Sequence, residues 1–339
     1  MVRLTTSRKV IATGRGGPEV LDVVEFPLPS PGRREIRIAV EAAGVAYGDV
    51  MRRRGVFAPR AAFTPGYDVV GIVDSAGRDC DRTLIGRRVA AMMPNLGTGG
   101  YAEHVCIPAV RAVAVPDDID PAEVVALGLN YITAYQLIHR ILPVPRGGRV
   151  LIHGAAGGVG SALLDLGRAR GLTMYGTASA GKHAFVRERG ATPIDYRSED
   201  FVARIEQLCP GGVDAVFDPI GGAHLRRSYA AVAPRGTLVS FGVSGDLARG
   251  SLGVIRGMAR FATLKFRPGP RVRLYLITLT RGAGWKHCRD DWRTLLAMRA
   301  RNELSPVVGA RVPFGDVRRA HELIDAAAVP GKIVLIVGR

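Results

Sequence analysis

The sequence has 339 residues, 47% of them hydrophobic, and a formal net charge of +17. This length is enough for two domains with cores of their own. The start of the chain lacks the apolar segment of a secretory signal, and no apolar run approaches the roughly 18 residues of a membrane span. The four cysteines lie far apart without a C-x-x-C pair. A disulfide framework and structural zinc are therefore not expected, and the predicted compartment is the cytoplasm.

The first 120 residues are predicted to form a compact, mostly antiparallel β module. Short segments of β-type pattern, separated by turns, lie at 34–44, 68–77, 85–93 and 101–108. The final segment KIVLIVG is a further strand, and we expect it to return to this module. We predict one domain over 1–122 that is completed by 266–339, with a second domain inserted at 123–265. The ligand is then expected in the cleft between the domains.

The stretch at 149–171, RVLIHGAAGGVGSALLDLGRARG, combines a short apolar strand, a glycine-dense turn and an apolar-periodic helix. Free backbone N–H groups and the helix dipole at such a turn attract an anion. The glycines also let the backbone approach a pyrophosphate closely. Their spacing is G-x-x-G-x-x-G, whereas the common dinucleotide fingerprint is G-x-G-x-x-G. Taken alone, the turn is also compatible with a plain tight connection.

The residues after this turn favour a dinucleotide-binding domain. Further strands are predicted at 172–179, 193–197, 213–221 and 236–242. Helical patterns at 181–190, 198–208 and 222–233 separate them. Strands that alternate with helices at this spacing form a parallel, doubly wound sheet. The sequence therefore predicts an α/β protein whose glycine turn holds a nucleotide.

The end of the second strand of this domain indicates which dinucleotide is bound. An NAD site usually carries an acid there, which would repel the 2′-phosphate of NADP. This strand ends at Ser179, Lys182 follows, and no acid occurs before Glu188. A hydroxyl and an ammonium group suit a phosphate. NADPH is the predicted cofactor, although Lys182 is also compatible with a solvated lysine at a helix start.

The order of the motifs resembles that of the medium-chain dehydrogenase/reductase superfamily, and most of all its zinc-independent quinone oxidoreductase branch, the zeta-crystallin-like proteins. The resemblance covers nearly the whole chain. The motifs that carry it are GVAYGDVMRRRGVF (44–57), PGYDVVGIVDSAG (65–77), GRRVAAM (86–92), NYITAYQLI (130–138), HGAAGGVG (153–160), IDYRSED (194–200), VFDPIGG (216–222), RGTLVSFG (235–242) and AHELIDAAAVPGKIVLIV near the end. The resemblance implies a GroES-like, mostly-β catalytic domain and a Rossmann domain. We also expect a homodimer, with 271–280 as a dimer-edge strand.

Zinc-dependent relatives carry a Cys ligand and a His ligand where this chain has Ala46 and Tyr67. Zinc requires about three or four N, S or O ligands in a fixed geometry. We therefore predict no metal. Without a Lewis acid, hydride transfer from NADPH to an electron-poor acceptor is favoured, so the expected substrate is a quinone or an α,β-unsaturated carbonyl.

The resemblance also assigns residues to the cofactor. They are Thr133 at the nicotinamide end, Gly157, Gly158 and Val159 at the pyrophosphate, Ser179, Lys182 and Tyr196 around the 2′-phosphate, and Phe241 and Gly242 where the fifth strand approaches the nicotinamide.

Three residues are candidates for orienting the acceptor or donating a proton: Tyr47, Asp49 and Tyr67. The alternative is a hydrogen-bonded structural role, above all for Asp49 and Tyr67. Many quinone reductases have Asn-Phe where this chain has Ala46-Tyr47, so Tyr47 brings a phenol where an amide is missing. Enoyl-thioester reductases often use a tyrosine donor at the position of Phe57, and phenylalanine cannot donate a proton. This difference argues against enoyl-thioester reduction, which is kept as the alternative reaction.

Residues 244–301 hold 13 Lys or Arg and three Asp. Within them, 251–269 can be placed on a helical wheel with a broad apolar side of Leu252, Ile255, Met258, Phe261, Ala262 and Phe266. Arg256, Arg260 and Arg267 fall opposite, while Lys265 falls among the apolar positions. We expect the apolar side to pack as the pocket wall. The alternative is a basic helix that lies on an anionic membrane surface or holds an anionic substrate tail. Nucleic-acid binding is the weaker alternative, since no recognised motif accompanies the charge.

Overall fold

The protein is described by a computed structural model that covers residues 5–56, 62–94, 98–245, 250–277 and 284–338. Contacts divide the chain into two compact units. The first unit holds 1–132, 278–302 and 306–339, and the second holds 133–277 and 303–305.

These limits differ from the predicted boundaries at 122 and 265. Helix α2 (Pro121–Ala126) belongs to the first unit because it packs on strands β3, β4, β14 and β15 there. Strand β13 (Arg271–Leu274) belongs to the second unit because it hydrogen-bonds in parallel with β12. The return to the first unit therefore follows Ile277.

The first unit is built on a seven-stranded sheet of order β14-β15-β3-β4-β5-β7, with β6 paired to β3 and a separate β1-β2 hairpin. Every pair is antiparallel except β14 with β15. The strands are β1 (Thr6–Ala12), β2 (Leu21–Pro27), β3 (Glu35–Val45), β4 (Asp68–Ala76), β5 (Arg88–Met92), β6 (His104–Pro108), β7 (Val113–Ala114), β14 (Val308–Pro313) and β15 (Lys332–Ile336). The mostly antiparallel GroES-like prediction is confirmed.

Helices α1 (Tyr47–Arg53), α9 (Gly284–Ala300) and α10 (Val317–Asp325) accompany α2 in the first unit. Along β3 the side chains alternate between the core and the surface, as expected for a strand with one buried face. Ile36, Ile38 and Val40 thereby enter a core that also contains residues of β1, β15 and α10. Helix α1, where Tyr47 and Asp49 lie, contacts α10.

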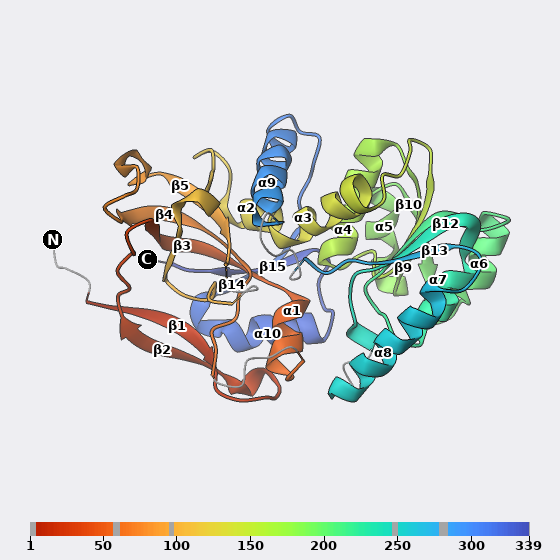
Figure 1. The fold of residues 1–339 in the computed structure, drawn as a ribbon, viewed down its shortest axis with the longest axis horizontal. Coiled ribbons are helices and arrows are strands. Elements are labelled where there is room, and N and C mark those ends of the chain that lie inside the picture. Colours follow the sequence, from red (N-terminus) through yellow and green to blue (C-terminus); the bar gives the residue numbers. More distant parts are fainter. Residues whose placement is uncertain (1–4, 57–61, 95–97, 246–249, 278–283, 339) are drawn as a thin grey trace. The chain divides into compact units, whose positions relative to one another are not determined.

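The second unit is a parallel sheet of order β10-β9-β8-β11-β12-β13 (Figure 1). This is the doubly wound order, in which strands are added outward from β8 on one side and then outward from β11 on the other. Helices α4 and α5 lie on one face, and α6, α7 and α8 lie on the other. The elements are α3 (Leu129–Gln136, which begins in the first unit), β8 (Arg149–Ile152), α4 (Gly158–Arg170), β9 (Thr173–Ala178), α5 (His183–Glu188), β10 (Ala191–Asp195), α6 (Phe201–Leu208), β11 (Val213–Asp218), α7 (His224–Ala230), β12 (Val232–Ser240) and α8 (Gly250–Lys265). The predicted Rossmann domain is confirmed.

The expected packing of the apolar side of α8 is met only in part. Phe261 packs against the core of this unit, whereas Met258 is 58% exposed and Phe266, directly after the helix, is 83% exposed. Among the described side chains of the helix, Leu264 is buried at 5% exposed. Gly253 and Gly257 are buried on the same side as Leu264, because their small size lets the helix approach its neighbours. The side chains of Leu252 and Ile255 lie outside the described ones. In the described ranges, no helix is long and apolar enough to cross a bilayer.

Candidate functional site

The glycine turn at the end of β8 is closely packed and leads directly into α4. Gly154 has φ +63°, a left-handed conformation that favours glycine. A Cβ at Gly160 would lie 2.2 Å from the carbonyl oxygen of Gly154, so a side chain there would push the helix off the strand. Gly157 caps α4 without a side-chain hydrogen bond, and Gly158 and Val159 begin the 13-residue helix. The first N–H groups of α4 are therefore open to a phosphate.

The predicted 2′-phosphate residues gather after β9 and β10. Ser179 caps a single 3-10 turn that ends at Lys182, and the Lys182 amide donates to the Ser179 carbonyl at 2.8 Å. Burial lowers the pKa of Lys182, and the positive charge of Arg197 lowers it further. The Arg197 guanidinium also lies 5.7 Å from the ring centre of Tyr196, which is 53% exposed. Arg197 was not singled out in the sequence, where it appears as an ordinary basic residue next to Tyr196.

The segment that follows β12, which the sequence assigns to the nicotinamide end of the cofactor, packs closely against the segment that follows β11. A Cβ at Gly242 would lie 2.3 Å from the Pro219 carbonyl oxygen, so the residues after β12 directly contact the turn after β11. The Phe241 amide donates to the Asp218 carbonyl at 2.9 Å. Thr133 is buried on α3, at 5% exposed. The assignment of these residues to the nicotinamide stays a prediction.

In the first unit, Asp49 is fully buried and holds several loops together. Its Oδ2 accepts from the Ala46 amide at 2.9 Å and from the Tyr101 hydroxyl at 3.1 Å, and its Oδ1 accepts from the Gly66 amide at 2.9 Å. Burial raises the pKa of Asp49 to about 6, although the two backbone hydrogen bonds oppose the shift. With both oxygens occupied, Asp49 can position the segments that carry Tyr47 and Tyr67.

The two candidate phenols differ in exposure. Tyr47, the first residue of α1, is 37% exposed, and burial still raises the pKa of its hydroxyl. Tyr67 is buried at 6%, where burial raises the pKa of its hydroxyl strongly and the Arg52 guanidinium lies 4.8 Å from its ring centre. A Cβ at Gly48 would lie 2.4 Å from the Tyr67 hydroxyl, so this ring packs closely on α1. Tyr47 is therefore the more accessible of the two candidate donors.

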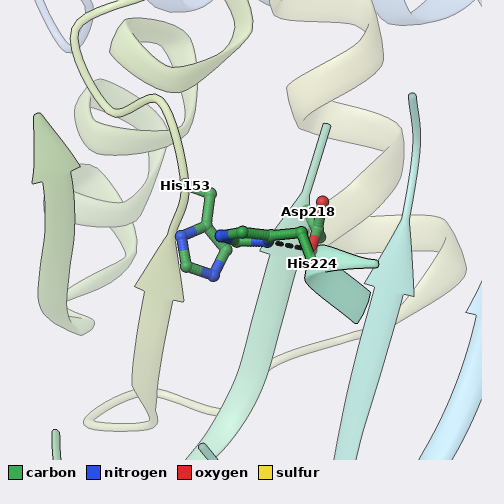
Figure 2. Close-up of side chains that lie close together, drawn as sticks. All are labelled: His153, Asp218 and His224. Atoms are coloured by element: carbon green, nitrogen blue, oxygen red, sulfur yellow. Dashed lines mark hydrogen bonds and ion pairs between the residues drawn. The ribbon is translucent and has the colours of Figure 1, made fainter. Parts of the chain in front are cut away.

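The residues at the zinc positions do not fit a zinc ion. Ala46 has no ligand atom, and the Tyr67 ring is packed on Gly48 and Arg52. Where the structure describes the chain, the side chains suited to hold a metal form one group, His153, Asp218 and His224, which lies in the Rossmann unit. Figure 2 shows these three side chains close together, with His224 hydrogen-bonded to Asp218.

Comparisons with known proteins agree with this architecture. Residues 32–117 match the family described as alcohol dehydrogenase GroES-like domain, and residues 190–335 match the family described as zinc-binding dehydrogenase. The chain is 30% identical to the human synaptic vesicle membrane protein VAT-1 homolog over 98% of this chain and 86% of that protein. It is 29% identical to a quinone oxidoreductase of Pseudomonas aeruginosa over 97% of this chain and 99% of that protein.

Solved structures give the same result. A quinone oxidoreductase from Escherichia coli, complexed with NADPH, is similar with a TM-score of 0.83 and 27% identity, and the match covers 97% of this chain and 100% of that one. A mycobacterial protein complexed with NADPH matches with a TM-score of 0.82 and 30% identity, over 98% and 100% of the two chains.

A GroES-like unit and a Rossmann unit with a glycine-rich turn, together with these relatives, place the chain among the oxidoreductases. The chain belongs to the medium-chain dehydrogenase/reductase superfamily, in its zinc-independent quinone oxidoreductase branch.

Proposed function

We propose that the protein is an NADPH-dependent reductase that transfers a hydride to a quinone or an α,β-unsaturated carbonyl without zinc. The observation that carries the proposal is the end of β9, where Ser179 caps the turn that ends at Lys182 and where an NAD site would carry an acid. Solved relatives complexed with NADPH support the choice of cofactor.

The chain's own residues bind and orient the reactants. The N–H groups at the start of α4 hold the pyrophosphate, and the cations Lys182 and Arg197, with Ser179 and Tyr196, hold the 2′-phosphate. The bound cofactor supplies a hydride, which carries two electrons. The acceptor takes that hydride at an electron-poor carbon or oxygen and then needs a proton. Tyr47, the half-exposed phenol of α1, is the proposed proton donor, while Asp49 and Tyr67 position its segment.

The substrate class is the finer part of this proposal. Phe57, which stands at the donor position of many enoyl-thioester reductases, lies outside the described residues, and phenylalanine has no proton to donate. A quinone or a simple enone is therefore favoured over an enoyl thioester. The four free cysteines support a reducing compartment such as the cytoplasm. A homodimer remains part of the proposal, with edge strand β13 as its candidate contact.

Consumption of NADPH is the test. Purified protein is assayed at 340 nm with a panel of quinones, enones and enoyl thioesters, and NADH is the matched cofactor control. Turnover of a quinone or an enone with NADPH is expected. Turnover confined to enoyl thioesters would reject the proposed substrate class, and no turnover with any acceptor would reject the reductase.

A second candidate function, action at an anionic membrane surface, is favoured by the exposed face of α8. Met258 and Phe266 project from this face, and Lys265 flanks it on one side while Arg256 and Arg267 flank it on the other. A helix with an exposed apolar face between cations is typical of interfacial helices. No acid occurs between 247 and 289, so a second copy of the chain placed on the same face would bring like charges together. An anionic lipid surface is the complementary partner.

A further inference from the structure

Five buried or half-buried polar side chains form one continuous hydrogen-bonded chain near the ends of the neighbouring strands β8 and β11, where the strand order of the Rossmann sheet changes sides. Ser228 lies at its centre. Its Oγ is 2.6 Å from Oδ2 of Asp218, 3.1 Å from Nε2 of His153 and 3.1 Å from Nδ1 of His224. His153 follows β8, Asp218 ends β11, and His224 begins α7 (Figure 2). Thr177 on β9 completes the chain, with its Oγ1 3.1 Å from Nδ1 of His153.

The direction of every hydrogen bond follows from the two ends. Ser228 has one hydroxyl proton, and the carboxylate of Asp218 is the strongest acceptor within its reach. Nε2 of His153 must then be the donor to Ser228, so Nδ1 of His153 accepts from Thr177. The Gly154 amide can only donate, and it donates to Oγ1 of Thr177 at 3.2 Å. Each donor thus has one acceptor, and His224 adds its Nδ1 proton to Asp218 at 2.9 Å.

This chain joins two loops that belong to the cofactor site. At one end is Gly154, the first glycine of the proposed phosphate cradle, the glycine turn at 154–160. At the other end, Oδ1 of Asp218 accepts from the amides of Ile220 at 2.6 Å and Gly221 at 2.9 Å, which fixes the turn after β11. That turn is the one that lies against Gly242 and the end of β12. A break in the middle of the chain therefore removes the side-chain link between the pyrophosphate end and the nicotinamide end, while the backbone bond from the His153 amide to the Phe217 carbonyl, at 3.1 Å, remains.

We propose that Ser228 and His153 are positioning residues that hold the phosphate cradle and the turn after β11 in register, so that NADPH meets both at once. The proposal rests on the proposed function, because it assigns these loops to NADPH. Neither side chain needs to touch the cofactor, since both are buried, at 0% and 1% exposed. An unpaired polar atom left in this dry position costs free energy, so the loops shift to satisfy it.

The test is Ser228→Ala, with Thr177→Val as a second variant that keeps a β-branched side chain in the strand. The matched control is Ser7→Ala, because Ser7 is equally buried and bonds Nδ1 of His104 at 2.9 Å in the other unit. NADPH binding is followed by fluorescence, and backbone hydrogen exchange is measured without cofactor. We expect both test variants to weaken NADPH binding about tenfold, since misplaced loops lose the binding geometry. Amides of 154–160 and 219–222 should exchange faster, and Ser7→Ala should change neither property.

Other outcomes separate the ideas. Test variants that bind NADPH as wild type does and show unchanged exchange in both loops would overturn the positioning role, even if their melting temperature falls. A wild-type protein that fails to bind NADPH would reject the proposed function, while the exchange measurement still decides whether the chain couples the loops. One equivalent of zinc retained by dialysed wild type but lost from His224→Ala would also overturn the chain, because the metal would take the lone pairs that the hydrogen bonds use.

Discussion

The Tyr101 hydroxyl lies 3.1 Å from Oδ2 of Asp49. This hydrogen bond links the segment before β6 to the start of α1, and both side chains are fully buried. The same hydroxyl is 3.3 Å from Nε2 of His321 on α10. Since Tyr101 donates to the carboxylate, His321 donates to Tyr101 through Nε2. Tyr101→Phe removes a partner from both groups, so we expect the free energy of unfolding to fall by about 1–3 kcal/mol. Urea unfolding measures it, and an unchanged midpoint would contradict this network.

The stability of the protein in acid should depend on three buried groups. Two of them lower the free energy of unfolding as the pH falls, and the third raises it. Burial lowers the pKa of His153 and of His321 to about 3, so both stay neutral in the folded chain while the unfolded chain takes up protons below 6.5. Their contribution to stability is lost as the pH falls from 6.5 toward 3. Asp49 acts in the other direction, because its raised pKa lets the folded chain hold a proton between about 4 and 6. Asp49→Asn should therefore steepen the loss of stability on acidification.

The measurement is the melting temperature of wild type and Asp49→Asn from pH 7 to pH 4. The variant is expected to be less stable throughout, so its slope against pH is the informative quantity. A slope equal to that of wild type would show that Asp49 does not titrate in this window.

Tyr47→Phe tests the proposed proton donor. The enolate formed by hydride addition to an enone benefits from a donor in place, whereas a reduced quinone can be protonated by solvent after release. Turnover of an enone should fall about a hundredfold, as expected for a lost general acid, and turnover of a quinone should change much less. Tyr175→Phe is the control because it removes a phenol that the proposed site does not use, one whose hydroxyl bonds the Leu208 carbonyl at 3.3 Å. Equal, small effects of Tyr47→Phe on both substrates would assign Tyr47 a structural role.

Lys332 and Asp68 form a buried ion pair, with Nζ 3.2 Å from Oδ2 and neither side chain more than 2% exposed. Removing one partner leaves a buried charge, so Lys332→Met is expected to cost about 3–5 kcal/mol of unfolding free energy. The double variant Lys332→Met with Asp68→Asn should recover much of the loss. Equal losses in the single and double variants, by urea unfolding, would argue against the pair.

The exposed face of α8 can be tested with vesicles. Wild type should co-sediment with phosphatidylserine-rich vesicles at low salt and detach as the salt concentration rises. Replacing Arg256, Lys265 and Arg267 with Gln should abolish this binding and leave NADPH binding intact. The charge-matched control replaces three exposed arginines of the first unit, Arg34, Arg82 and Arg87. Wild type that ignores these vesicles, or equal losses in both triple variants, would rule out a specific surface at α8.

Much of the fold was predictable because most Rossmann strands are short apolar runs, and apolar residues recur at helical spacing in the helices that follow them. Strand β9 was expected at 172–179 and spans Thr173–Ala178. The limits of the units were harder, since strand pairing over long sequence distance decides them. Nothing in the four residues of β13 indicates that they pair with β12. The boundary between the domains was therefore predicted too early, at 265.

The site was predictable where backbone geometry demands a residue type, as at Gly154 and Gly160. Arg197 was missed because a basic residue after Tyr196 gains meaning only once the fold shows that its charge acts on Lys182. Ser228 was missed for a similar reason: its partners come from strands 75 and 10 positions away along the chain. The exposure of Met258 and Phe266 was not predicted, because a helical wheel shows which residues share a side and cannot show which side packs on the sheet.

The most direct test of the central claim is the dissociation constant of NADPH measured beside that of NADH, for wild type, Lys182→Ala and Arg197→Ala. Each cation should contribute a charge-assisted contact with the 2′-phosphate, worth about 1.5–3 kcal/mol, or roughly tenfold to a hundredfold in affinity. Wild type is expected to prefer NADPH, and each variant should lose NADPH affinity while its NADH affinity stays the same. Equal affinity of wild type for the two cofactors, or parallel losses for both in the variants, would contradict the account.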